Sequence, residues 1–282
     1  MSDLATFRQR IDEIDTELLK LLNERASVAK EIGVLKNREG LPVYAPERED
    51  RLLRSLVEKS HGPLSGEAIR AIYREIMSAS LALEKDIAIV CLGPSGSPTH
   101  QAARNKFGSS VRYVFRSHVD EVLKDVKDDE SDCGVVPIED PEHGLVSHTL
   151  DALAETDLSI CAEIILPGDR TDETRSGARF FVMGRTPNPP SGNDHTLLLL
   201  RTDDKPGALV LALEPFKEFA INLSHFASRP ASRGSQDIYF FVEAEGHTRD
   251  LQVKDLFREL SKRCRAVKIL GSYPKQTLAA TS

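Results

Sequence analysis

Apolar residues recur every three or four positions along the first stretch of the chain, residues 3–37. These residues are Leu4, Phe7, Ile11, Ile14, Leu18, Leu21, Leu22, Ala29, Ile32 and Leu35. Such spacing predicts one long helix with a single apolar side. At about 1.5 Å per residue the helix is roughly 50 Å long. One small domain cannot cover that length, so we expect a partner helix from a second copy of the chain.

The remainder of residues 1–85 predicts two shorter helices. Gly40 and Pro42 mark a loop, after which Pro46 suits the first turn of a helix that runs to about residue 60. A His-Gly-Pro break follows, and Ser65 is expected to cap a third helix. The first domain is therefore predicted as an all-α three-helix unit.

The pattern changes after residue 85. Short apolar strands alternate with amphipathic helices, which is typical of an α/β lobe. The predicted strands cover 87–92, 111–115, 133–138 and 158–166, and the helices cover 99–107, 119–126 and 146–156. A Pro-rich linker at 186–194 precedes the last block, 195–275. That block has a β-α-β-β-α-β order, with its third strand at 237–244, and predicts an α+β ferredoxin-like domain.

The composition excludes several classes of function. The net charge of −7 and the pI near 5.7 argue against a nucleic-acid partner. No apolar run is long enough for a membrane span or a signal peptide. The four cysteines lack metal-ligand spacing and lie in mostly apolar stretches, so we expect reduced core residues in a cytoplasmic protein.

Two cations interrupt the apolar side of the first helix. Arg25 stands where an apolar residue is expected, and Lys36, eleven residues on, points within roughly 20° of it. Two such cations repel each other unless an anion lies between them. Either acidic residues of a neighbouring helix pair with them, or they form a pocket for a small polyanion. Arg8 points about 80–100° away from both, so it need not serve the same pocket.

The charged pattern of this domain resembles a known family. The segments LATFRQRIDEIDTELLKLLNERASVAKEIGVLK, VYAPERE and REIMSASLALE resemble the all-helical chorismate mutases over nearly all of residues 4–85. The resemblance implies an intertwined homodimer with two active sites, each taking one arginine from the partner chain. It also implies a substrate-binding set made of Arg8 (from the partner), Arg25, Lys36, Arg48, Glu49, Ser80 and Glu84.

The implied reaction explains these residue types. Chorismate rearranges to prephenate within one molecule, so the enzyme needs no nucleophile, metal or cofactor. It must hold a compact conformer and stabilise charge on the breaking ether oxygen. By resemblance, the arginines bind carboxylates, Lys36 and Glu84 donate to the ether oxygen, and Glu49 accepts from the ring hydroxyl. Glu84 can donate only when protonated, and Ala45 replaces an aspartate of some relatives. Lys36, Glu84 and Arg25 are the expected catalytic residues.

The second block resembles the first lobe of prephenate dehydratases, through CLGPSGSPTHQAA and DCGVVPIEDPEHGLVSHTLDAL. Three departures stand out. The family's Gly-Thr-Phe-Ser step is Gly-Ser-Pro-Thr at 96–99, and Asp140-Pro141 replaces an Asn-Ser. Only residues 168–177 separate the first lobe from the segment ARFFVMG, so the family's second lobe is missing. Ala178, the first residue of that segment, stands where the family has a catalytic threonine. We therefore expect a truncated, degenerate dehydratase lobe without dehydratase activity. Three histidines, His100, His143 and His148, are candidate general acids, but surface or structural roles are favoured.

The last block resembles an ACT regulatory domain of the type attached to prephenate dehydratases. Its match lies in DKPGALVLALEPFKEFAINLSHFASRP. The resemblance implies an effector site for phenylalanine or tyrosine formed by Gly207, Ala208, Leu209, Val210, Ser228, Arg229 and Pro230. Ala227 replaces a glutamate of the family, which affects the affinity or the choice of ligand.

The sequence thus favours a cytoplasmic chorismate mutase of aromatic amino acid biosynthesis, from the bifunctional chorismate mutase/prephenate dehydratase family. We expect a homodimer or a higher oligomer that is modulated at an ACT domain. The expected domains are the mutase at 1–85, the degenerate lobe at 86–185 and the ACT domain at 195–275. Three alternatives remain: an amino-acid sensor with a vestigial mutase site, an isochorismate-pyruvate lyase, and residual dehydratase activity.

Overall fold

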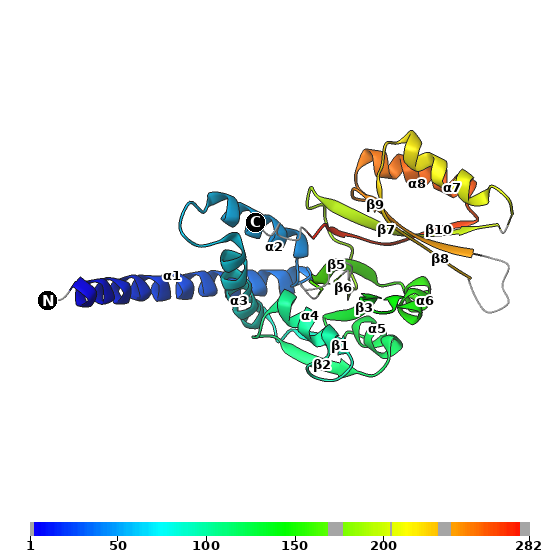
Figure 1. The fold of residues 1–282 in the computed structure, drawn as a ribbon. Helices are drawn as coiled ribbons and strands as arrows, with labels where there is room; N and C mark the ends of the chain where they lie inside the picture. The colour runs from blue at the N-terminus through cyan, green and yellow to red at the C-terminus, as the bar shows by residue number, and fades with distance from the viewer. Residues whose placement is uncertain (1–2, 169–176, 204, 231–237, 277–282) are drawn as a thin grey trace.

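The computed structural model describes residues 3–168, 177–203, 205–230 and 238–276. The chain begins with three helices, α1 (Asp3–Glu39), α2 (Pro46–Lys59) and α3 (Gly66–Glu84). Proline is the first residue of α2, and Ser65 Oγ accepts a hydrogen bond from the backbone N–H of Ala68 at 3.1 Å, as predicted. The N-terminal part of α1 projects far from the rest of the molecule (Figure 1). The predicted helical domain is confirmed.

An α/β lobe follows the helices. Its strands are β1 (Ala88–Leu92), β2 (Arg112–Arg116), β3 (Cys133–Asp140), β4 (Gly144–Leu145), β5 (Ser159–Leu166) and β6 (Ala178–Gly184). Its helices are α4 (Pro98–Phe107), α5 (Val119–Lys127) and α6 (Ser147–Glu155). The sheet order is β2-β1-β3-β6-β5, and β4 pairs with β3. The α/β character predicted for this block is confirmed.

Strand β6 lies inside this sheet. It pairs antiparallel with both β3 and β5, whereas β1 pairs parallel with β2 and β3. Phe180, Phe181, Val182 and Met183 are at most 2% exposed. The segment ARFFVMG, for which the sequence analysis predicted no element, is therefore an inner strand of the sheet that is covered on both faces. Within the short connection 168–177, positions 169–176 lie outside the described residues.

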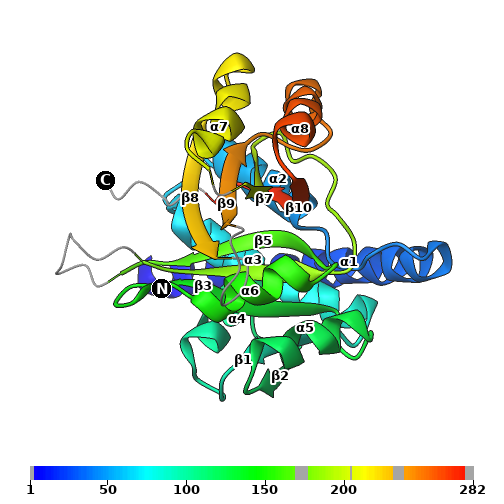
Figure 2. The same ribbon diagram turned by 90° about the vertical axis from the view of Figure 1, so that its right-hand side faces the viewer.

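The C-terminal block forms a second sheet. Its strands are β7 (Asp194–Thr202), β8 (Leu223–Pro230), β9 (Ile238–Glu245) and β10 (Ala266–Pro274), and its helices are α7 (Ala208–Glu218) and α8 (Leu251–Arg263). All pairings are antiparallel in the order β10-β7-β9-β8. The predicted β-α-β-β-α-β order is observed, although residue 237 lies outside the described residues. This C-terminal sheet lies between its two helices and the α/β lobe (Figure 2).

The two sheets share one hydrophobic core. Leu197, Leu199 and Phe241 of the C-terminal sheet pack in the same cluster as Phe181 and Met183 of the lobe. Alternate residues of the C-terminal strands pack against α7 and α8 instead. A Cβ atom at Gly271 of β10 would lie 2.4 Å from the carbonyl oxygen of Ile160 in β5, so only glycine permits this backbone approach.

The predicted linker at 186–194 is part of this interface. Asn188 is 7% exposed and donates to the carbonyl oxygens of Cys161 and Ser272, at 2.5 and 3.1 Å. Pro-rich composition predicted a linker, and residues 186–193 contain no helix or strand, whereas Asp194 begins β7. The composition could not indicate that the segment is buried, because that depends on two sheets distant in sequence.

All four cysteines are free thiols. Cys91, Cys133 and Cys161 are buried and Cys264 is half-buried. Burial raises the pKa of Cys91 and of Cys161 to about 12. These thiols therefore stay protonated and behave as apolar core groups. In the described part of the chain, no helix has the length and apolar character needed to cross a membrane.

Candidate functional site

A cavity of about 470 Å³ lies among the three N-terminal helices and the connector between α1 and α2. Six polar side chains predicted from the sequence line it, two from each helix: Arg25, Lys36, Arg48, Glu49, Ser80 and Glu84. Leu21, Val28, Ile32 and Leu81 are among its apolar walls. The structure therefore gathers residues from 60 positions of sequence into one concave site.

Arg25 and Ser80 form one side of the cavity. The Arg25 guanidinium donates to Ser80 Oγ at 2.6 Å, and Ser80 Oγ donates to the carbonyl oxygen of Ile76 at 2.8 Å. Ser80 is buried, and its bond to Ile76 in the preceding turn of α3 fixes the hydroxyl orientation. A hydroxyl partner leaves the charge of Arg25 uncompensated, which suits it to bind an anion.

Lys36 and Glu84 form the opposite side. Lys36 Nζ lies 3.0 Å from Glu84 Oε2 and donates to the carbonyl oxygen of Val43 at 2.8 Å. Both side chains are largely buried, with 16% and 9% of their surface exposed. The ion-pair interpretation of the buried cations is thus correct for Lys36. It is wrong for Arg25, which has no carboxylate partner among the described residues.

Glu49 reaches a cation outside the helical domain. Its Oε1 lies 2.9 Å from Nζ of Lys106, which belongs to α4 of the α/β lobe. Sequence reasoning missed Lys106, because nothing in the local pattern of α4 indicates a contact 57 residues back in the chain. Tyr44 also lines the cavity and was missed. Burial, with a contribution from the nearby Glu49 charge, raises the pKa of Tyr44 well above its usual value, so it remains a neutral phenol.

The cavity is suited to a small dianion with an apolar body. Arg25 and Arg48 have no carboxylate partner in the described part of the chain, whereas Lys36 is paired with Glu84. Guanidinium groups bind carboxylates through two parallel hydrogen bonds. Apolar walls exclude water and strengthen these contacts.

Arg8 is not part of this cavity. It lies 17 residues before Arg25 on the same helix, which corresponds to about 25 Å. Its surroundings on α1 are exposed apolar side chains, including Phe7 at 68% and Ile11 at 56% exposure. Arg8 therefore cannot reach the cavity of its own chain.

The three candidate histidines of the lobe have local roles. His100 Nδ1 accepts a hydrogen bond from the backbone N–H of Gly96 at 2.9 Å, next to the start of α4. Burial and the charge of Arg104 lower the pKa of His100, which favours the neutral ring that this contact requires. His143 is bonded to Asp140 in an exposed turn, and His148 is exposed on α6. These positions agree with the structural and surface roles favoured by the sequence.

The predicted effector residues lie in two segments of the C-terminal sheet domain. Gly207 has a φ of 83° and precedes the first turn of α7, formed by Ala208, Leu209 and Val210. Ser228, Arg229 and Pro230 end β8, an edge strand of the sheet. Arg229 also forms an ion pair of 3.0 Å with Asp151 of α6.

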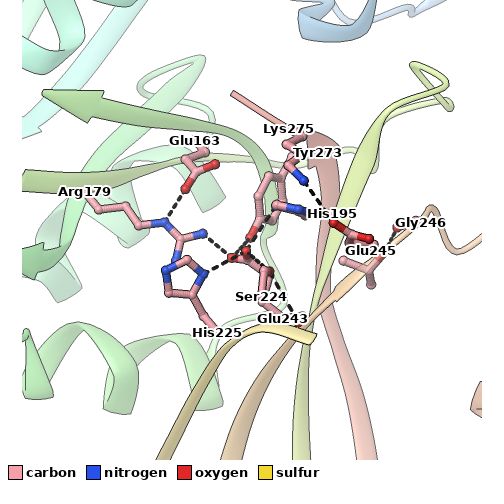
Figure 3. Close-up of polar contacts among 11 residues, drawn as sticks. Glu163, Arg179, His195, Ser224, His225, Glu243, Glu245, Gly246, Tyr273 and Lys275 are labelled. Carbon is pink, nitrogen blue, oxygen red and sulfur yellow. Dashed lines mark hydrogen bonds and ion pairs between the residues drawn. The ribbon is translucent and has the colours of Figure 1, made fainter. Parts of the chain in front are cut away.

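A second polar cluster lies between the two sheets. Arg179 of β6 pairs with Glu163 of β5 and with Glu243 of β9 (Figure 3). Glu243 also accepts hydrogen bonds from Tyr273 OH at 2.7 Å and Ser224 Oγ at 2.5 Å. Arg179 directly follows Ala178, the position where the resemblance to dehydratases predicts a threonine. Here the arginine joins the lobe to the C-terminal sheet.

The comparisons with known proteins agree with this arrangement. Residues 7–85 match the family "Chorismate mutase type II", and residues 89–169 match the family "Prephenate dehydratase". A bifunctional chorismate mutase/prephenate dehydratase of Aquifex aeolicus is 34% identical over 360 alignment positions, which cover 99% of each chain. The present chain belongs to the bifunctional chorismate mutase/prephenate dehydratase family. Its helical domain is a chorismate mutase domain, and the protein is an isomerase of that class.

Solved prephenate dehydratases resemble about two thirds of this chain. The Streptococcus mutans enzyme is 31% identical with a TM-score of 0.57, covering 66% of this chain and 97% of that one. The Arthrobacter aurescens enzyme, solved in complex with L-Phe, has the same fold at 22% identity and a TM-score of 0.60. That match covers 67% of this chain and 90% of the Arthrobacter chain.

Proposed function

We propose that the helical cavity binds chorismate and rearranges it to prephenate. The observation that carries this proposal is the convergence of Arg25, Lys36 and Arg48 with Glu49, Ser80 and Glu84 in one cavity. In this mechanism Arg25 and Arg48 hold the two carboxylates, and Ser80 keeps Arg25 oriented. Lys36 donates to the ether oxygen, where negative charge grows in the transition state. Glu84 donates there as well once its carboxylate, which pairs with Lys36 in the free protein, carries a proton. Glu49 accepts from the ring hydroxyl.

The proposed active unit is an intertwined homodimer. Apolar side chains along the first six turns of α1 are exposed, such as Leu4 at 57% and Leu18 at 50%. A stripe of this length is expected to be covered by a second copy of the same helix. Arg8 would then enter the partner's cavity and complete the set of carboxylate-binding arginines. The proposed mutase domain extends over residues 1–85.

We also propose that the lobe at 86–185 is a truncated dehydratase that has lost its activity. The alignment with the Aquifex relative has 360 positions whereas this chain has 282 residues, so at least 78 positions hold no residue of this chain. The dehydratase match ends at residue 169, and β6 begins at Ala178. A missing second lobe leaves no opposing wall to exclude water from a substrate. Ala178 also lacks the hydroxyl that the family's threonine supplies.

The C-terminal domain, 195–275, is proposed to be an ACT domain that binds phenylalanine or tyrosine. Its ferredoxin-like strand order supports this, as does the L-Phe complex of the Arthrobacter dehydratase. The first turn of α7 and the end of β8 would form the effector site, with backbone groups binding the amino-acid termini. Isothermal titration of the full chain with each amino acid tests this, with Gly207→Ala as the variant expected to weaken binding, since its φ is positive.

The mutase proposal is tested by Arg25→Ala in the full chain. Loss of a charged group that stabilises a carboxylate and the transition state lowers kcat/KM by about 10²-fold or more. Arg258→Ala is the matched control, since Arg258 is exposed on α8 and pairs with Asp255. Equal activity in the two variants would remove Arg25 from the mechanism.

The dehydratase proposal needs a separate assay. Purified full chain is incubated with prephenate at neutral pH, and phenylpyruvate is followed against an enzyme-free sample, because acid alone converts prephenate. We expect the two traces to coincide. Enzyme-dependent phenylpyruvate would contradict the loss of activity.

A further inference from the structure

Residues 105–110, at the end of α4, form one of the contacts between the dehydratase-like lobe and the mutase domain. The backbone N–H and hydroxyl of Ser109 both donate to Glu75 on α3, at 3.1 and 2.7 Å. The N–H of Ser110 donates to Ser78 Oγ at 3.0 Å, and Ser78 is 1% exposed. This segment therefore fixes the helix that carries Ser80 and Glu84.

The same segment also holds the connector between α1 and α2. Phe107 packs against Tyr44 with ring centroids 4.8 Å apart, and both residues belong to the hydrophobic core of the lobe. Val43 belongs to that core as well, and its carbonyl oxygen is the acceptor for Lys36. One wall of the mutase cavity is thus anchored in the lobe rather than in the helical domain.

Among the contacts of this segment, the ion pair of Lys106 is the one that involves a residue lining the proposed substrate cavity. It pairs with Glu49 at 2.9 Å, and the two side chains are only 21% and 13% exposed, so salt screens the pair weakly. Glu49 also borders a neighbouring pocket that holds other cations, namely Arg54, Arg70, Arg74 and Lys275. On its other side are Arg25, Lys36 and Arg48, which line the mutase cavity. When a carboxylate freed from Lys106 turns toward the cavity cations, it competes with the substrate for the same charges.

We propose that the dehydratase-like lobe is a working part of the mutase site, in which Lys106 is a positioning residue for Glu49. This inference rests on the proposed mutase function of the cavity. It gives the lobe a role that needs no dehydratase chemistry. Lys106 holds the Glu49 carboxylate away from the substrate-binding cations and directed toward the ring hydroxyl.

The test compares three variants of the full chain, Lys106→Gln, Lys106→Arg and Lys124→Gln. Lys124 is the matched control, because it is an exposed lysine of α5 in the same lobe and pairs with Asp128. For Lys106→Gln we expect a rise of about tenfold in KM for chorismate, with a smaller change in kcat. Lys106→Arg keeps the charge and is expected to stay within about threefold of the parent chain. A purely structural role would lower the thermal stability without changing KM of the folded protein.

A double variant separates positioning from an independent effect. In a Glu49→Gln background, Lys106→Gln is expected to change kcat/KM by less than about twofold, because its partner no longer carries a charge. The inference is overturned if Lys106→Gln has the KM of Lys124→Gln, or if its loss is undiminished in the Glu49→Gln background. Arg25→Ala serves as the separate check of the site. If Arg25→Ala is inactive and Lys106→Gln is unaffected, only this inference fails. If Arg25→Ala is fully active, the proposed mutase site fails.

Discussion

Gly33 of α1 lies directly against Glu84 of α3. A Cβ atom at position 33 would be 2.7 Å from Glu84 Cα and 2.8 Å from its Cβ. The two helices therefore approach as closely as backbones allow at this point. The approach brings Lys36, one turn further along α1, within 3.0 Å of the Glu84 carboxylate. Helix packing and the proposed catalytic pair thus depend on the same glycine.

Gly33→Ala separates two opposing effects. Helix propensity alone would stabilise the variant by about 1 kcal/mol. The steric conflict with the Glu84 backbone forces α1 and α3 apart, which costs about 1–3 kcal/mol. We expect a lower midpoint of thermal unfolding together with reduced mutase activity. The control is Gly62→Ala, where a Cβ would meet no atom within 4 Å. A stabilised and fully active Gly33→Ala protein would contradict the close packing.

The proposed donor role of Glu84 is tested by two substitutions at this position. A glutamate can donate to the ether oxygen only in its protonated form, whereas glutamine always carries a donor and leucine carries none. We expect Glu84→Gln to stay within about tenfold of the parent kcat, and Glu84→Leu to lose about 10²-fold or more. Measuring kcat for both variants checks this. Equal activity of the two variants would argue against a donor role for Glu84.

The dimer proposal predicts complementation between two inactive variants. In a mixed dimer of Arg8→Ala and Arg25→Ala chains, one cavity receives both arginines and the other receives neither. Random mixing therefore restores about a quarter of the parent activity, since half of the dimers are mixed and half of their sites are intact. The chains are unfolded together, refolded and assayed. Activity no higher than that of the separate variants would exclude a site shared between chains.

The buried Glu243 carboxylate is expected to make the stability of the two-sheet unit depend on pH in the acid range. Burial alone would raise its pKa, but contacts with the His195 and His225 rings and the charge of Arg179 together lower it well below the usual value. A lowered folded-state pKa means that the stabilisation is present above the unfolded value of about 4.3 and is lost as pH falls below it.

Glu243→Gln should therefore be less stable at neutral pH, by about 3–5 kcal/mol, because Arg179 loses a buried partner. Its free energy of unfolding should also change less than that of the parent chain as the pH falls below about 5. This window is set by the unfolded-state glutamate pKa of about 4.3. Denaturant unfolding at several pH values measures both effects, with exposed Glu142→Gln as the control. If the free energy of unfolding of Glu243→Gln fell with decreasing pH as steeply as that of the parent chain, this assignment would be wrong.

Much of the fold could be predicted because the decisive signals are local. Apolar spacing gave α1, and Pro46 and Ser65 marked the starts of the next two helices. The joint core of the two sheets could not be predicted, because it requires that β5 and β10, about 100 residues apart, lie side by side. Gly271 permits that contact, yet in the sequence it resembles any other glycine within a strand.

The candidate site likewise contains residues that the local sequence pattern could predict and residues that it could not. Arg25 and Lys36 were recognisable because charged residues interrupted an apolar side of a helix, and the family resemblance supplied their companions. Lys106 was not recognisable, because its partner Glu49 lies in another domain and α4 carries other exposed cations such as Arg104. Contacts that join domains leave little trace in the local pattern of either one.

The most direct test of the account is the product formed when the full chain is supplied with chorismate at neutral pH. We expect prephenate to accumulate stoichiometrically, with no enzyme-dependent phenylpyruvate, and we expect this turnover to disappear in Arg25→Ala. Absence of turnover, combined with amino-acid binding, would indicate a sensor rather than an enzyme. Conversion of isochorismate to pyruvate and salicylate, without prephenate formation from chorismate, would contradict the assignment of the cavity as a mutase site.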